Sequence, residues 1–199
     1  MESMSLEGGY AEPVLGAQNA FRSIMDALAR PGTICNFGQA PGAPASLVPG
    51  LAALALTLCD HDTPLWLDPE LAGEEPVTDW LRFHTGAPIV IDPAAAHFAL
   101  ASDAGKLPSL DRFALGSDQY PDRSATIVLA LSSLLDGPPL SFRGPGIRGV
   151  VTIAPQGLPA DFTIQWSANR ALFPRGVDLL LVAGSEIVGL PRTSRLVEA

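Results

Sequence analysis

The sequence predicts a single α/β domain built around a mixed central sheet that helices cover on both faces. Three observations lead to this fold class. Helix-like and strand-like segments alternate through the first two thirds of the chain, and hairpin-like segments dominate the last third. The 199 residues suffice for one sizeable core but are few for two. Because we find neither a repeat nor an internal linker, we expect residues 1–199 to form one domain, with residues 1–12 as a flexible N-terminus.

The first predicted elements are two helices separated by a loop. Apolar residues recur at helical spacing from Val14 to Leu28, and the proline and glycine that follow at a short distance end the pattern. Residues 32–50 are rich in Gly and Pro, so we expect a connection there, with one short strand around Ile34. Residues 50–60 are apolar on all sides, which predicts a buried helix.

The middle of the chain predicts a helix between strands, then a central strand. "EEPVTDWLRFHTGAP" places a proline and acidic residues at a helix start, and Gly86 at its end. "ATIVLALSSL" is apolar on both faces, as a central strand between two layers should be. Shorter apolar segments predict further strands at residues 63–68, 88–92 and 96–102, and a short helix at residues 109–114.

The last third predicts two hairpins around one helix. "PLSFRGPGIRGVVTIAP" indicates two strands joined by a glycine turn. "LPADFTIQWSANRALFPRG" places apolar residues from Leu158 to Phe173 at helical spacing. "VDLLLVAG" and "EIVGLP" then predict two strands around a turn near Gly184.

The charge pattern argues against two classes of partner. The formal net charge is −9 and basic residues form no run, so we expect neither a nucleic-acid surface nor a polybasic membrane patch. Charged residues make up 17% of the sequence, against roughly 25% in typical soluble proteins. Such a composition indicates either a surface covered by another subunit or a bias toward Ala, Gly, Pro and Arg.

The compartment is predicted from three features. Residues 31–59 carry no charge, but their prolines and glycines rule out a membrane-spanning helix. The first residues are acidic and lack an apolar core, so we expect no secretory signal. Cys35 and Cys59 stand far apart without a C-x-x-C pair, which favours reduced thiols in the cytoplasm.

"LCDHDTPLWL" places Cys59, Asp60, His61 and Asp62 in a row. Zinc ligands need a spacing that lets them converge, as in C-x2-C or H-x3-H, and consecutive side chains on a regular element do not converge. Short Asp side chains instead bond to nearby backbone and end helices. We therefore predict a turn between a buried helix and a strand, and no metal site.

"GPGIRG", residues 144–149, matches the letters of the dinucleotide fingerprint G-x-G-x-x-G. That fingerprint needs a helix after it, whereas a strand-like segment follows here. We therefore predict a tight turn in which Gly144 or Gly146 has a positive φ. The amides of such a turn could also bind an anion as a backbone nest.

The sequence offers no residue set for a bound cofactor. Lys106 is the only lysine and lies in a loop-like segment, which argues against a pyridoxal Schiff base. The sequence contains no P-loop and no G-x-S-x-G, and no Cys/His pair stands out. We therefore predict no cofactor and no catalytic residue, although acid–base sites can be assembled from residues far apart in sequence.

Arginines in the second half of the chain are the candidate anion ligands. Their planar forks suit phosphate and phosphonate oxygens, and several lie beside glycines or prolines. For any single arginine, surface charge together with compositional bias is the favoured explanation, and anion binding is the alternative that stays open. The candidates are Arg143, Gly144, Gly146, Arg175 and Arg192.

Six segments in order resemble a known family. They are "FRSIMDALARPG", "LTLCDHDTPLWL", "LRFHTGAP", "GPGI", "FPRGVDLLLV" and "LPRTSR", and they span Phe21 to Arg195. Together they resemble the PhnH family, whose members belong to the carbon–phosphorus lyase core complex that degrades phosphonates in bacteria. Each segment alone is weak evidence for this family, whereas the six segments in this order are specific to it.

The resemblance implies a cytoplasmic protein that works with three other core subunits, G, I and J, and forms a homodimer when isolated. The complex couples an alkylphosphonate to the ribose of ATP and releases adenine, and a radical iron–sulfur protein later cleaves the C–P bond. The implied fold resembles the large domain of pyridoxal-phosphate-dependent transferases without the cofactor lysine. No catalytic residue is carried over.

Two functional hypotheses follow. The first is an assembly subunit of a phosphonate-processing transferase/lyase system that is not catalytic alone. The second is a stand-alone enzyme or anion-binding protein with a transferase-like pocket. An arginine-lined pocket would favour the second, and a large apolar surface patch would favour the first.

Overall fold

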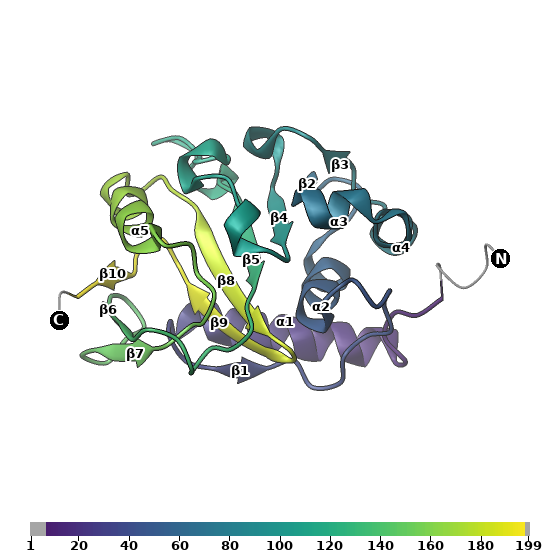
Figure 1. Cartoon of the computed structure of the whole chain (residues 1–199), viewed down its shortest axis with the longest axis horizontal. Helices are drawn as coiled ribbons and strands as arrows, with labels where there is room; N and C mark the ends of the chain where they lie inside the picture. Colours follow the sequence, from purple (N-terminus) through teal and green to yellow (C-terminus); the bar gives the residue numbers. More distant parts are fainter. Residues whose placement is uncertain (1–6, 198–199) are drawn as a thin grey trace.

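A computed structural model describes residues 7–197 as one α/β domain with a seven-stranded mixed sheet (Figure 1). The strand order is β1-β9-β8-β5-β4-β2-β3. β5 (Thr126–Ala130) is the middle strand, as its two apolar faces predicted. The neighbours of β5 are β4 (Phe98–Ala101) and β8 (Asp178–Ala183), both parallel to it.

The edges of the sheet are formed by short strands. β2 (Leu65–Leu67) lies between β4 and β3 (Ile89–Val90) and is parallel to both. At the other edge, β9 (Glu186–Leu190) and β1 (Cys35–Asn36) are antiparallel to their neighbours. These strands confirm the mixed sheet that the alternation of segments predicted.

One face of the sheet is covered by α-helices. α1 (Pro13–Ala29) and α2 (Pro49–Leu58) pack against each other and against the strands, and α4 (Glu75–Thr85) lies beside α2. Six of the ten residues of α2 are buried, as its uniformly apolar sequence predicted. Gly86 adopts a left-handed conformation and ends α4, also as predicted.

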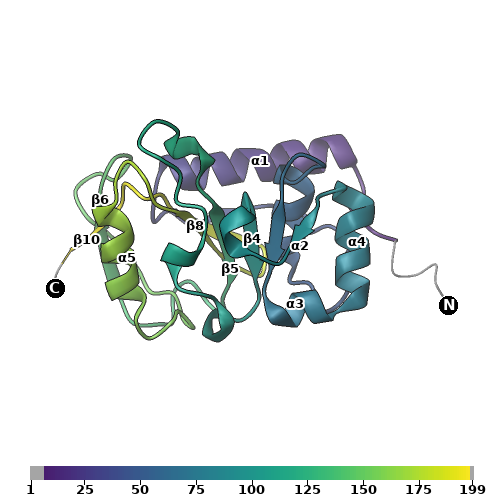
Figure 2. The ribbon, with the colours of Figure 1, turned by 90° about the horizontal axis from the view of Figure 1, so that it is seen from above.

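The opposite face is covered by less regular structure. α5 (Phe162–Ala171) lies there, across the sheet from α1 (Figure 2). Four short 3-10 helices lie in the segments that connect β3 to β4 and β4 to β5. The expected short helix at residues 109–114 is one of them. They are η1 (Pro93–Ala95), η2 (Ala104–Lys106), η3 (Leu110–Arg112) and η4 (Pro121–Arg123).

A separate three-stranded sheet completes this second layer. It has the order β10-β6-β7, with β6 (Leu140–Arg143) and β7 (Val151–Ile153) forming the predicted hairpin. β10 (Arg195–Leu196) was not predicted and pairs antiparallel with β6. The small sheet and α5 lie at one end of the long axis, and α4 and the short helix α3 (Pro69–Gly73) lie at the other (Figure 1).

The predicted flexible N-terminus falls partly outside the described residues, since residues 1–6 are not described. Gly9 forms an antiparallel bridge with Gly42. The hydroxyl of Tyr10 donates to the carbonyl oxygen of Ala53 at 3.2 Å.

No helix among residues 7–197 is long and apolar enough to span a membrane.

The order in which the chain adds strands to the sheet reverses between β2 and β4, which are parallel neighbours. The segment after β2 packs on the face of α1 and α2, whereas the segment after β4 packs on the face of α5. This arrangement is a topological switch point, and open α/β sheets bind ligands at the carboxyl ends of the two strands that flank it. In this protein that position is occupied by a side chain of the protein itself.

That side chain is Asp68, whose carboxylate is fully buried directly after β2. Its Oδ1 accepts from the Leu71 amide at 2.9 Å and thereby caps α3. Its Oδ2 accepts from the Ser102 amide at 2.6 Å, the Ser102 hydroxyl at 2.9 Å and the Asp103 amide at 3.0 Å. Four donors therefore compensate the cost of burying the charge.

We predict that Asp68→Asn lowers the free energy of unfolding by about 3 kcal/mol, because an amide cannot accept at both ends and leaves buried donors unpaired. Urea unfolding measures the loss. Asp92→Asn is the matched control, since the Asp92 carboxylate caps η1 through one exposed bond to the Ala94 amide. We expect the control to change stability by less than about 1 kcal/mol, and equal losses for the two variants would contradict the prediction.

Candidate functional site

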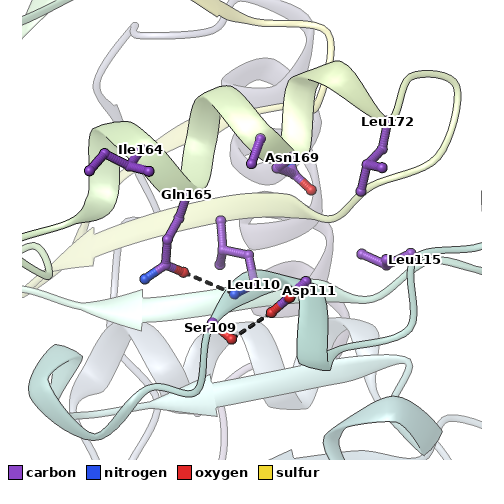
Figure 3. A pocket seen from close by; sticks show the side chains of 9 residues that line it. Ser109, Leu110, Asp111, Leu115, Ile164, Gln165, Asn169 and Leu172 are labelled. Atoms are coloured by element: carbon purple, nitrogen blue, oxygen red, sulfur yellow. Dashed lines mark hydrogen bonds between the residues drawn. The ribbon is translucent and has the colours of Figure 1, made fainter.

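A groove of about 380 Å³ lies between α5 and the segment that contains η3 (Figure 3). Apolar side chains from both elements supply most of its surface, and a few polar groups stand at its rim. It is lined by Ser109, Leu110, Asp111, Leu115, Ile164, Gln165, Ala168, Asn169 and Leu172.

Two amide side chains hold the walls of the groove in place. Gln165 accepts from the Leu110 amide at 2.9 Å and donates to the Asp161 carboxylate at 2.8 Å, so it joins η3 to α5. Asn169 is buried and bonds to the Val177 backbone twice, at 3.0 Å and 2.8 Å. Both amide groups are thereby occupied by the protein's own backbone and carboxylate.

The chemistry available in the groove is limited. Of the described residues that line it, Asp111 alone has a titratable side chain, and its carboxylate already accepts from the Ser109 hydroxyl. Ile164 is 73% exposed at the rim. The groove therefore suits an apolar group better than it suits an anion, and it offers no acid–base pair.

Three of the five predicted anion ligands lie together on the hairpin of the small sheet. Arg143 ends β6 and is exposed. Gly144 to Ile147 form a turn closed by the Ile147 amide, which donates to the Gly144 carbonyl at 3.1 Å. Gly146 has φ +80°, as predicted, and with the preceding proline this makes a type II turn.

The other two predicted ligands form ion pairs within the protein. Arg192 donates through its backbone amide and Nε to Oδ1 of Asp178, at 2.7 and 3.1 Å, and through Nη2 to Oδ2. Its Nη1 donates to the carbonyl oxygen of Pro121 at 2.6 Å. Nε of Arg175 lies 3.3 Å from Oδ1 of Asp118 without hydrogen-bond geometry. Anion binding by these five residues stays a prediction.

"LCDHDTPLWL" forms the predicted turn between α2 and β2. The Asp60 amide donates to the Thr63 hydroxyl at 2.6 Å, and the Asp62 amide donates to Oδ1 of Asp60 at 2.9 Å. Burial raises the pKa of the Cys59 thiol to about 12, and the nearby Asp60 carboxylate adds to the shift. Within residues 7–197, no three His, Cys, Asp or Glu side chains gather closely enough to hold a metal ion.

Lys106 lies in η2 and forms an ion pair with Glu70. Its side chain is 45% exposed, which fits the expected solvated segment better than a cofactor pocket.

Desolvation raises the pKa of two further groups besides Cys59. They are the phenol of Tyr10, where a hydrogen bond from Thr57 opposes the shift, and the thiol of Cys35.

Sequence reasoning missed several residues that shape these regions. Asp68 carried a signal, because an aspartate followed by proline is typical of a helix N-terminus. The ion pair of Arg192 with Asp178 joins segments that are distant in sequence, and so does the strand register that sets Arg195 opposite Arg143. No local sequence pattern predicts either.

The chain is similar to proteins of phosphonate metabolism. The family described as bacterial phosphonate metabolism protein (PhnH) matches residues 8–197. A Rhizobium meliloti (strain 1021) protein named alpha-D-ribose 1-methylphosphonate 5-triphosphate synthase subunit PhnH is 47% identical over 195 residues, which cover 98% of this chain and 97% of the relative. A Stutzerimonas stutzeri protein named "Putative C-P lyase subunit protein HtxG" is 34% identical over 179 residues, covering 90% and 85% of the two chains.

We predict that Gly146→Ala destabilises the protein more than Gly149→Ala does. Both glycines have a positive φ, +80° and +78°, so both variants bear a backbone cost of about 1 kcal/mol. A Cβ at Gly146 would lie 2.2 Å from the carbonyl oxygen of Ala29, whereas a Cβ at Gly149 meets nothing within 4 Å. The steric contact should add about 2 kcal/mol for Gly146→Ala.

Thermal unfolding of the two variants and the wild type measures the difference. Equal melting temperatures for the two variants would show that the hairpin does not depend on close packing against the end of α1.

Proposed function

The chain belongs to the PhnH family of bacterial phosphonate metabolism proteins, and from this premise we propose that it is a subunit of the carbon–phosphorus lyase core complex. In that complex it is needed for coupling an alkylphosphonate to the ribose of ATP, with release of adenine. The relative named as a subunit of ribose 1-methylphosphonate 5-triphosphate synthase carries this proposal, because the similarity extends over 98% of the chain.

Within the complex, the chain has an assembly role and is not catalytic alone. The buried carboxylate of Asp68 supports this role, because it occupies the amides that would otherwise face a ligand at the switch point. The groove beside α5 supports it too, because its polar rim carries a carboxylate rather than arginines. An anion-binding enzyme with a transferase-like pocket receives no comparable support.

The partners are the other core subunits, G, I and J, and the site of action is the cytoplasm. Two free cysteines, Cys35 and Cys59, are consistent with a reducing compartment. The likeness to the large domain of pyridoxal-phosphate-dependent transferases extends to the fold and not to the cofactor, and the position of Lys106 on an exposed short helix supports this distinction.

The isolated chain forms a homodimer through the outer face of α1. Val14, Phe21 and Met25 recur along one side of this helix and are 68%, 49% and 39% exposed. Phe21 and Met25 also line a shallow groove that extends to Thr57 of α2. Such a row of exposed apolar side chains is typical of a subunit interface.

Reconstitution of the complex tests the proposed function. We expect that omission of this chain abolishes adenine release from ATP plus methylphosphonate, because the assembly is then incomplete. Adenine release at the same rate without the chain would contradict the proposal.

A second arm tests the assembly role. Asp111→Asn removes the one charge in the groove, and in the assembled complex we expect turnover to stay within a few-fold of wild type. A loss of about a hundredfold, about 2.7 kcal/mol of transition-state stabilisation, would show that this chain contributes a catalytic group.

Phe21→Glu tests the dimer. We expect the variant to be monomeric by light scattering at micromolar concentration, because a charge replaces an apolar side chain at the centre of an interface that should bury about 1,600 Å². Phe83→Glu is the control, since Phe83 is 64% exposed on α4 and lies outside the α1 face. A dimeric Phe21→Glu variant, or a monomeric control, would contradict the assignment.

A further inference from the structure

Three exposed arginines belong to the small sheet and to the loop of its hairpin, in a chain of net charge −9. Arg143 ends β6, Arg195 begins β10, and Arg148 lies in the loop between β6 and β7. Residues 137–160 contain no Asp or Glu, although the whole chain has 21 acidic residues. We name Arg143, Arg148 and Arg195 the arginine face.

The pleat of the strands places Arg143 and Arg195 on the same side. Phe142 is fully buried and Leu196 packs against the core, so their strand neighbours point outward. The register sets Arg195 directly opposite Arg143. Like charges at directly opposed positions repel and lower the stability of a sheet. The fold therefore keeps two like charges at opposed positions, and an acidic partner would relieve their repulsion.

None of the three arginines has a compensating charge among residues 7–197. The ion pairs of that part of the chain use other basic residues, such as Arg175 and Arg192. All three members of the arginine face are exposed. Their guanidinium groups are thus available to carboxylates of another molecule.

The backbone beneath the arginine face is fixed before any partner binds. A Cβ at Gly144 would lie 3.0 Å from the carbonyl oxygen of Thr193, so the hairpin packs closely on the segment that leads to Arg195. The indole of Trp166 donates to the carbonyl oxygen of Ser194 at 3.2 Å, and both residues are fully buried. Such preorganisation reduces the ordering cost of binding.

The opposite end of the molecule carries the opposite charge. Residues 60–79 contain seven acidic residues and neither lysine nor arginine, and their helices α3 and α4 lie far from the small sheet along the long axis (Figure 1). The overall charge of −9 disfavours a nucleic acid as the ligand of the arginine face. A short acidic protein segment carries fewer charges than a nucleic acid, so the net charge of the chain repels it less while the arginine face still attracts it.

We propose that the arginine face docks an acidic segment of another subunit of the complex. This inference rests on the proposed function, since it requires that the chain works in an assembly. An extended acidic segment that crosses β6 and β10 places carboxylates against both opposed arginines and reaches Arg148 in the adjoining loop. The contact fixes the orientation of this chain in the complex rather than contributing to the chemistry.

Binding of the purified chain to the assembled remaining subunits, followed by calorimetry at two salt concentrations, tests the proposal. We expect wild-type binding to weaken as the salt concentration rises, because salt screens exposed charges. Arg143→Glu should bind at least about tenfold more weakly. Its melting temperature should be unchanged or raised, because the new carboxylate faces Arg195, so that weaker binding is not caused by unfolding.

Arg112→Glu is the matched control, because Arg112 is exposed and also has no ion pair within residues 7–197. It should bind like the wild type. Wild-type affinity of the Arg143→Glu/Arg195→Glu variant would overturn the proposal, whereas failure of the wild-type chain to bind would instead overturn the proposed function. Inorganic phosphate that binds stoichiometrically to the arginine face and leaves binding to the other subunits unchanged would also overturn the proposal and assign a small anion as the ligand.

Discussion

Three hydrogen bonds to the buried carboxylate of Asp68 join the ends of β2 and β4, the two strands between which the strand order of the central sheet reverses, and a fourth bond caps α3. β2 and β4 lie side by side, but the segments that follow them leave on opposite faces. The Asp68 amide adds a further bond at this point, because it donates to the carbonyl oxygen of Leu100 at 3.0 Å. The buried charge is tolerated because backbone amides and one hydroxyl of Ser102 solvate it.

The same carboxylate bears on function. In open α/β sheets, the amides at a switch point commonly bind the anionic part of a ligand. Here the protein's own side chain takes that place, and Gln165 and Asn169 are likewise occupied in the groove beside α5. The unsatisfied features lie instead on the outside, as the apolar row on α1 and the opposed arginines on the small sheet. This distribution fits a subunit whose main interactions are with other chains.

The fold was largely predictable from the sequence, because its regular elements have clear local patterns. The apolar period of α1, the uniformly apolar sequence of α2 and the two apolar faces of β5 each predict how the element is buried. Gly146 was predictable for the same reason, since a proline–glycine pair defines its turn. β10 and the bonds of Asp68 were not predicted, because two residues of strand or one aspartate become significant only when segments more than thirty residues apart meet. The ion pairs of Arg175 with Asp118 and of Arg192 with Asp178 were not predictable either, because they join segments that are distant in sequence.

The protein itself closes the carboxyl edge of its sheet, and we place the partner surfaces elsewhere. Hydrogen exchange read by mass spectrometry tests it directly, on the chain alone, with ATP plus methylphosphonate, and with the other subunits. We expect the amides of Leu71, Ser102 and Asp103 to exchange slowly in the free chain and to be unaffected by nucleotide, and residues 140–153 to exchange more slowly once partners bind. Rapid exchange at those three amides that nucleotide alone suppresses would contradict it, because it would identify an open ligand site at the switch point.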